Sequence, residues 1–328
     1  MLLDLGYTQS SADKCVFIRR SGSNIHIISV YVDDLGLFAN SKEGMAQIKE
    51  ELNGKYVMKD LGEMKKILGI HVERNHREGT LKISQGLYID VILACFHMQN
   101  ANTFSTPLNI SIKFKTPQNV NSPKVDVPYA KAIGSLIYAA LGTRPDLAFT
   151  VQQLSQFTTS YEQDHWTAIK HAFGYLKGTC NVGIIFKKDA DMELEVFVDS
   201  DFANQSDALS IGGYAAMIGG GCIAWSSKKQ RTVSLSTTEA EYKALTEGAK
   251  QLIWLRRALQ ELGVNQDQPT SIRSDNLGAI TISHDSTYHA QTKHINIAYH
   301  FIHEKVASNE ATRTYVRSKE NVRELGIL

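Results

Sequence analysis

Residues 191–328 alternate between strand and helix patterns, and this order restricts the fold more than any other feature of the chain. Apolar residues at every second position over 194–199 predict the first strand, because one face of a strand is buried. Three strands, a helix, a strand and further helices predict an α/β domain with a mixed sheet and flanking helices. The segments are 194–199, 212–219, 222–226, 236–262, 270–276, a helix from about 277 and another over 294–307.

Carboxylates stand at the ends of these predicted elements. Asp199 ends the first strand and Asp275 ends the fourth, and sites in α/β sheets collect where strands end. The long helix between them offers Glu239 and Glu241. Steps of three and four residues from Glu241 follow an apolar stripe that should face the sheet, whereas the same steps from Glu239 follow a polar face. The stripe is Ala244, Leu245, Gly248, Ala249, Leu252 and Leu255, and the polar face is Tyr242, Lys243 and Thr246.

The run Ser236-Thr237-Thr238-Glu239 has the spacing of a capping box, which assigns Glu239 to the start of the helix. Glu241, Asp199 and Asp275 would then converge, and three carboxylates without a basic partner repel one another strongly. A hard divalent cation with oxygen ligands resolves that repulsion. Two such ions can clamp the attacking water and the leaving oxygen of a phosphodiester. Each acid alone is typical of a solvated strand end or helix cap, but the three together favour a metal site.

The net charge is too small for the whole surface of the protein to be positively charged. The formal charge is +1, with 43% hydrophobic and 21% charged residues, as in an ordinary globular protein. Any basic groove must be local, and the run 226–231 is the candidate, although by itself it is more typical of a solvated turn. No segment has the length of a membrane span or the pattern of a signal peptide. We therefore expect an intracellular protein, cytoplasmic or nuclear, without a membrane partner.

Cysteine and histidine patterns give little support to a transition-metal site. The four cysteines contain no C-x-x-C pair, which argues against structural zinc and against a disulfide framework. Four histidines lie close together near the C-terminus and keep a zinc site open as a minor alternative. They are His289, His294, His300 and His303.

The first 190 residues predict a different organisation. Two short strands over 25–39 flank Asp33 and Asp34, which form a plausible hairpin tip. Ser41 is a candidate N-cap for a helix to about Leu52. Residues 99–128 hold four of the six prolines and predict an irregular linker. Further segments are a strand over 67–72, one over 81–84, a helix over 85–96, helices over 129–142, 145–158 and 163–177, and a break over 187–191.

The C-terminal motifs resemble the ribonuclease H of copia-type retrotransposons, in the family's order and nearly at its spacing. The acids lie in the blocks 196–201, 236–242 and 274–276, and the blocks 225–230 and 292–302 match as well. The resemblance implies cleavage of the RNA strand of RNA–DNA hybrids by four carboxylates and two Mg²⁺ ions. It makes Asp199, Glu241 and Asp275 catalytic metal ligands.

The fourth carboxylate departs from the family pattern. The family has an Asp three residues after an Asn, followed by a helix, whereas here Asn321 is followed by Glu324 and the sequence stops at Leu328. Glu324 is nevertheless the fourth expected metal ligand and catalytic acid. Because its arm is longer and near the terminus, we expect weaker metal binding at that corner.

Upstream motifs resemble the reverse transcriptase of the same family. Tyr31-Val32-Asp33-Asp34 is similar to the palm motif, which makes Asp33 and Asp34 metal ligands by resemblance. Residues 60–70 resemble the primer-contact region and 81–98 the thumb, and three blocks within 133–179 resemble the connecting segment. Only about 30 residues precede Asp33, too few for the earlier palm strand and the fingers, so we expect polymerase activity to be absent.

The resemblance divides the chain into three regions with mixed α/β and α+β character. They are a truncated reverse transcriptase palm and thumb over 1–106, a linker and helical connection over 107–190, and a ribonuclease H-like domain over 191–328. The expected function is metal-dependent hydrolysis of RNA in RNA–DNA hybrids, with the remainder of a Pol polyprotein as a further partner. The alternative is a catalytically inactive retroelement relic that at most binds nucleic acid.

Overall fold

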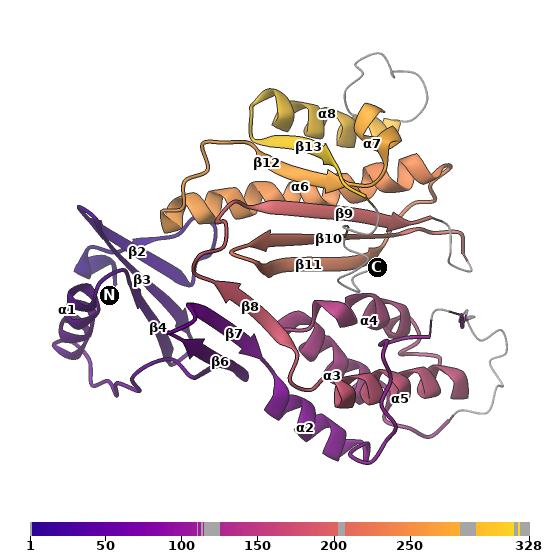
Figure 1. Ribbon diagram of the computed structural model, residues 1–328, viewed down its shortest axis with the longest axis horizontal. Coiled ribbons are helices and arrows are strands. Elements are labelled where there is room, and N and C mark those ends of the chain that lie inside the picture. Colours follow the sequence, from indigo (N-terminus) through magenta and orange to yellow (C-terminus); the bar gives the residue numbers. More distant parts are fainter. Residues whose placement is uncertain are drawn as a thin grey trace. The chain divides into compact units, whose positions relative to one another are not determined.

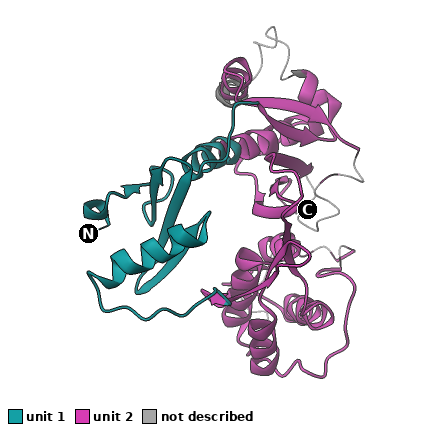
Figure 2. Cartoon of the chain, turned by 60° about the vertical axis from the view of Figure 1, so that its left-hand side comes forward, with its two compact units in different colours: residues 1–65, 251–268 teal, residues 66–250, 269–328 magenta. Residues whose placement is uncertain are grey.

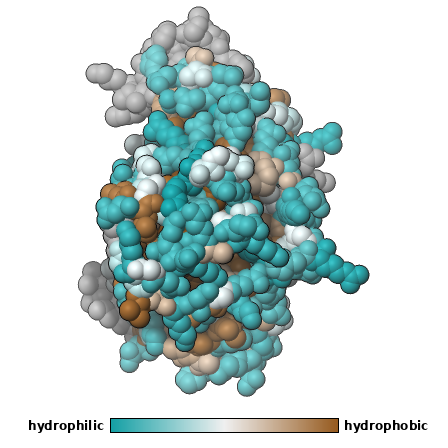
Figure 3. All heavy atoms as spheres, turned by 90° about the vertical axis from the view of Figure 1, so that its left-hand side faces the viewer, coloured by the Kyte–Doolittle hydropathy of each residue, from teal (hydrophilic) through white to brown (hydrophobic). Residues whose placement is uncertain are grey.

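The computed structural model describes residues 2–109, 111–112, 114, 125–202, 207–282, 293–317 and 321. The chain forms two compact units, Met1–Lys65 with Gln251–Gln268 and Lys66–Lys250 with Pro269–Leu328 (Figure 2). None of the described helices is long and apolar enough to cross a membrane. The face shown in Figure 3 is mostly hydrophilic, with hydrophobic side chains in small separate patches.

The first unit contains a four-stranded antiparallel sheet in the order β1-β2-β3-β4. Ile28 of the sheet and Ile48 of helix α1 are fully buried in its core. Ser41 caps α1 as predicted, because its Oγ accepts a hydrogen bond from Gly44 N at 3.0 Å. The predicted hairpin over 25–39 is confirmed, whereas the first two strands were not predicted. The elements are β1 Thr8–Gln9, β2 Val16–Ser21, β3 Asn24–Tyr31, β4 Asp34–Ala39 and α1 Lys42–Asn53.

A second antiparallel sheet, in the order β5-β6-β7-β8, belongs to the other unit. The single strand predicted over 67–72 is wrong, because Leu68 and Gly69 have φ angles of 50° and 75°. Two positive φ values in a two-residue loop turn the chain into a hairpin. Strand β8 lies in a segment where no strand was predicted. The strands are β5 Lys66–Ile67, β6 Ile70–Asn75, β7 Thr80–Ser84 and β8 Gly183–Lys187.

Four helices of this unit share one hydrophobic core, in which Leu136 and Phe173 are fully buried. The helix predicted over 85–96 packs in that core with the later helices. The helix predicted over 145–158 begins as a short 3₁₀ turn, and Pro145 stands at its first position, where a missing N–H costs no hydrogen bond. The helix ends earlier than predicted. The elements are α2 Gly86–Cys95, α3 Tyr129–Gly142, the turn Pro145–Leu147, α4 Ala148–Ser155 and α5 Gln163–Gly178.

An ion pair at the turn before α4 is hydrogen-bonded to the end of α5. Arg144 is fully buried, and its Nε and Nη2 donate to the two carboxylate oxygens of Asp146 at 3.0 and 2.6 Å. Its Nη1 donates to Thr179 O at 3.0 Å, and Tyr175 donates to Asp146 Oδ2 at 2.7 Å. Because both charged groups have hydrogen-bond partners, this cluster holds the start of α4 against the end of α5.

The C-terminal sheet has five strands in the order β11-β10-β9-β12-β13 (Figure 1). Strands β9, β10 and β11 pair antiparallel, and β12 is parallel to both β9 and β13. The predicted mixed sheet with flanking helices is therefore confirmed, and β13 is an additional strand. The elements are β9 Glu195–Asp201, β10 Ile211–Ile218, β11 Gly221–Lys229, α6 Thr237–Leu262, β12 Thr270–Ser274, α7 Leu277–Ile282, α8 Lys293–Ala307 and β13 Ala311–Tyr315.

The two faces of this sheet are covered differently. Helix α6 approaches Val198 of β9 closely at Gly248, where an added Cβ would lie 2.4 Å from Val198 Cγ1. The opposite face packs Phe197 and Trp225 against Ala148 of α4. Trp225 Nε1 also donates to Ala140 O of α3 at 2.8 Å. The helical segment thus completes the core on one side of the sheet.

The predicted apolar stripe of α6 is buried, as expected from its spacing. The polar face predicted for the same helix is partly wrong, because Tyr242 and Thr246 are buried as well. Thr246 satisfies its hydroxyl by donating to Tyr242 O at 2.9 Å. The helix therefore buries a wider face than a single stripe, and Lys243 marks its polar edge.

Replacing Gly248 with Ala is expected to destabilise the protein by roughly 1–3 kcal/mol, because the added methyl group overpacks a stiff contact with Val198. Gly134→Ala in α3 is the matched control, since an added Cβ meets nothing within 4 Å there. Ala has the higher helix propensity, so the control should gain up to about 1 kcal/mol. Urea unfolding measures both, and equal stability of the two variants would show that α6 does not need this close approach.

Candidate metal centre

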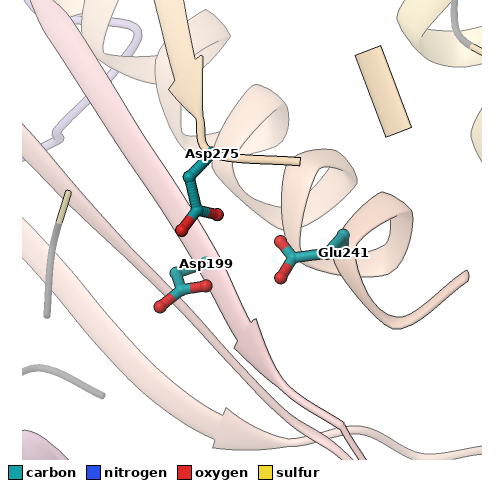
Figure 4. Close-up of side chains that lie close together, drawn as sticks. All are labelled: Asp199, Glu241 and Asp275. Atoms are coloured by element: carbon teal, nitrogen blue, oxygen red, sulfur yellow. The ribbon is translucent and has the colours of Figure 1, made fainter. Parts of the chain in front are cut away.

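Three acidic side chains converge at one edge of the C-terminal sheet. Asp199 lies on β9, Asp275 directly follows β12, and Glu241 lies on α6. Their carboxylates point toward a common space (Figure 4), and one oxygen from each lies within 4.8 Å of the others. Because β9 and β12 are adjacent and parallel, their carboxyl ends lie at the same edge of the sheet.

The site is buried and negatively charged. Asp199 is 1% exposed and Glu241 6% exposed. Ser200 N donates to Asp199 Oδ1 at 2.9 Å and to Glu241 Oε1 at 3.2 Å. Burial, followed by the charges of Asp199 and Asp275, raises the pKa of Glu241 to about 8. The charged form of Glu241 is therefore unfavourable without a compensating cation.

The residues present fit a divalent cation. Glu241 Oε2 is buried and has no hydrogen-bond donor among the described residues. Three carboxylate oxygens form a hard donor set of the kind that Mg²⁺ prefers. A cation bound to them would use the unpaired oxygen and relieve the mutual repulsion.

The histidine alternative finds no support in the described part of the chain. The acidic group is the one cluster of at least three His, Cys, Asp or Glu residues that the described residues bring within ligand distance, and it contains no histidine. His289 lies outside the described residues, as does the side chain of His294.

Glu239 forms the helix cap that its spacing predicts. Its backbone N donates to Ser236 Oγ at 3.1 Å, and its Oε2 accepts from Leu235 N at 2.8 Å. Its other oxygen pairs with Lys243 Nζ at 3.0 Å. These contacts hold Glu239 away from the acidic cluster and leave Glu241 as the helix's contribution to it.

The remaining expected ligands stay predictions. Glu324 lies outside the described residues. Asp33 lies in the loop between β3 and β4, Asp34 begins β4, and both are exposed. Among the described residues, no third Asp, Glu, His or Cys lies close enough to these two to form a metal-binding cluster. The hairpin tip predicted for the two residues is thus present, without further evidence of a metal there.

Asn321 has a role at the site that its motif position did not reveal. It is 2% exposed, and its Nδ2 donates to Val198 O at 3.1 Å. Val198 directly precedes Asp199, so this hydrogen bond supports the backbone of the strand that carries the acid. Sequence reasoning found the residue only through the family pattern.

Comparisons with known proteins identify the relatives of this chain. The family described as reverse transcriptase (RNA-dependent DNA polymerase) matches residues 1–110. The Retrovirus-related Pol polyprotein from transposon TNT 1-94 of Nicotiana tabacum is 39% identical over 322 residues, covering 96% of this chain and 24% of the relative. The chain spans about a quarter of the length of the curated Pol polyproteins that it matches.

A solved structure shows the same fold over most of the chain. The foamy viral protease-reverse transcriptase in complex with ds DNA covers 89% of this chain and 46% of its own chain, with a TM-score of 0.50 and 14% identity. Together the observations define a reverse transcriptase region followed by a ribonuclease H-like domain. The chain belongs to the copia-type family of retrotransposon Pol polyproteins.

Proposed function

We propose that this chain hydrolyses the RNA strand of RNA–DNA hybrids in a metal-dependent reaction. The observation that carries the proposal is the buried cluster of Asp199, Glu241 and Asp275, with ligand oxygens within 4.8 Å of one another. Membership of the copia-type Pol family supports the substrate class. The hybrid, and the remainder of a Pol polyprotein, are accordingly the proposed partners.

Asp199, Glu241 and Asp275 would hold the Mg²⁺ ions, with Glu324 as the proposed fourth ligand. Bound there, the ions would supply positive charge at the scissile phosphodiester and at the attacking water. The protein contributes a preformed site: Ser200 N orients two of the carboxylates, and Asn321 fixes the backbone beside Asp199. Burial of Asp199 and Glu241 keeps bulk water from screening their charges.

We propose Asp33 and Asp34 as metal ligands of the reverse transcriptase region, but we do not extend the proposal to DNA synthesis. A polymerase site needs a further carboxylate that binds the metal ions. Among the described residues, no third acid forms a cluster with Asp33 and Asp34. Both side chains are exposed in the described structure.

The direct test compares nucleic acids of one sequence. With Mg²⁺, the purified chain is expected to cleave the RNA strand of a short RNA–DNA hybrid and to leave double-stranded DNA and single-stranded RNA intact. Addition of EDTA should stop the reaction. Equal cleavage of double-stranded DNA, or cleavage that survives EDTA, would contradict the proposal.

A further inference from the structure

Arg19 of β2 and His26 of β3 lie directly opposite each other in the N-terminal sheet. Arg19 Nη2 lies 3.1 Å from His26 Nδ1. Because a guanidinium group can only donate hydrogen bonds, Nδ1 must accept, so the ring is neutral and carries its proton on Nε2. His26 is also only 3% exposed. The neutral form of this histidine is therefore part of the packed interior of the first unit.

Arg19 connects this pair of strands to two further elements of the first unit. Its Nη1 donates to Leu5 O, at the end of the N-terminal 3₁₀ turn Leu3–Leu5, at 2.8 Å. Its Nη2 also pairs with Glu51 Oε2 of α1 at 2.7 Å. The guanidinium group lies over the ring of Tyr7, at 4.6 Å from the ring centroid. One side chain thus joins the N-terminal turn and α1 to the sheet.

The other ring nitrogen of His26, Nε2, is buried without a hydrogen-bond partner among the described residues. It lies against the first turn of α1, because a Cβ on Gly44 would be 2.7 Å from it. The charged groups that act on the ring are Arg19 and Glu51, and β4 places Ala39 opposite it. The first turn of α1 also carries the positive end of the helix dipole, which disfavours a cation at this position.

We propose that Arg19 and His26 form an acid-sensitive latch, which holds the N-terminal turn and α1 on the sheet while His26 is neutral. Protonation would turn Nδ1 from an acceptor into a donor, so the hydrogen bond from Arg19 would be lost and two cations would face each other in the interior. Arg19 would then move away, and its contacts with Leu5 and Glu51 would loosen. The latch does not depend on the acidic cluster of the other unit.

The direction of the pH dependence follows from the surroundings of the ring. Burial, followed by the charge of Arg19, lowers the pKa of His26 below its ordinary value of 6.5, and the charge of Glu51 opposes this shift. The unfolded chain therefore takes up this proton at a higher pH than the folded chain does. The stability that the latch contributes is present above pH 6.5 and is lost as the pH falls below about 6.5, toward the lower pKa of the folded state.

Titration of the histidine ring signals by NMR tests the latch directly. His26 should be in the form protonated on Nε2 near neutral pH, and it should titrate at a lower pH than the exposed His76. The backbone amide signals of Leu5 and Glu51 should shift with the same midpoint as His26, which a ring that is merely packed would not cause. If His26 titrates together with His76, or if the two amides do not follow it, the proposal is overturned.

Two substitutions should move the titration of His26 in opposite directions. Arg19→Gln removes the cation beside the ring and should raise the pKa of His26, whereas Glu51→Gln removes the opposing charge and should lower it. A general loosening of the unit would instead raise the pKa in both variants. Shifts of the same sign would therefore contradict the coupling between Arg19 and His26.

Urea unfolding at several pH values tests what the latch contributes to the fold. The unmodified chain should lose stability as the pH falls below about 6.5, and His26→Gln, which is neutral at every pH, should lose less over the same range. His76→Gln, at an exposed histidine, is the matched control and should lose as much as the unmodified chain. An equal loss in all three proteins would show that His26 plays no part in the acid response, even if His26→Gln is less stable at every pH.

Discussion

Glu241→Gln is expected to lower the rate of hybrid cleavage by about a hundredfold or more, because the charged form of this side chain is needed to hold the metal ions. Glu239→Gln should retain most of the activity, since Glu239 faces its cap and Lys243 rather than the acidic cluster. The measurement is single-turnover cleavage of one hybrid at one Mg²⁺ concentration. The two substituted residues lie two positions apart on the same helix, so each variant is the control for the other.

Folding must be checked for both variants. Glu239→Gln weakens the cap of α6 and should cost about 1 kcal/mol of stability or less, so circular dichroism should show an intact fold for each protein. A Glu239→Gln variant that loses cleavage while Glu241→Gln retains it would mean that α6 presents a different face to the site.

The same substitution at Glu241 is expected to stabilise the metal-free protein. Burial and the neighbouring carboxylates raise the pKa of Glu241 from 4.5 to about 8 in the folded state. The unfolded chain therefore releases this proton more readily, and stability is lost as the pH rises from about 4.5 toward 8. Glu241→Gln removes that cost and should gain roughly 1–3 kcal/mol at about pH 7 in EDTA.

Urea unfolding in EDTA measures this gain, and Glu247→Gln provides the control. Glu247 lies on the same helix, is well exposed and pairs with Lys250, so its replacement should change stability little. The gain at Glu241 should shrink toward about pH 5, where the unfolded chain also begins to hold the proton. Mg²⁺ should stabilise the unmodified chain and leave Glu241→Gln unaffected. A Glu241→Gln variant that is less stable in EDTA would contradict the electrostatic account of the site.

Local sequence patterns predicted the parts of the site that depend on local geometry. The alternation around Val196 and Val198 placed Asp199 on a strand, and the apolar stripe after Glu241 chose between two neighbouring acids. Both inferences rest on the fixed side-chain periods of strands and helices. The capping box at Ser236 depends on a spacing of three residues, so the sequence predicts it equally well.

Pairing between strands that are distant in the sequence was harder to predict. Nothing in the local pattern shows that β12 lies parallel to β9, yet this neighbour relationship brings Asp275 to Asp199. The edge strand β13 has alternating polar residues and no long apolar run, so it carries a weak signal. The hairpin at Leu68 and Gly69 was missed because a leucine at positive φ is unusual.

Buried polar groups were the hardest to predict. Arg144 is fully buried, although arginine is one of the residues most often exposed. Its burial depends on Asp146, Tyr175 and Thr179 arriving together from two elements. Gln230 Nε2 similarly donates to Ala240 O, and Lys243 Nζ donates to Val233 O. Both acceptors are backbone carbonyls, whose positions no residue pattern indicates.

The most direct test of the central claim is the cleavage of an RNA–DNA hybrid by the purified chain and by its Asp199→Asn variant across a Mg²⁺ titration. Asp199 is the most buried of the three acids that the structure brings together. We predict Mg²⁺-dependent cleavage of the RNA strand by the unmodified chain and none by the folded variant at any Mg²⁺ concentration. Equal cleavage by both proteins, or none by either, would contradict the assignment of these acids as a nuclease site.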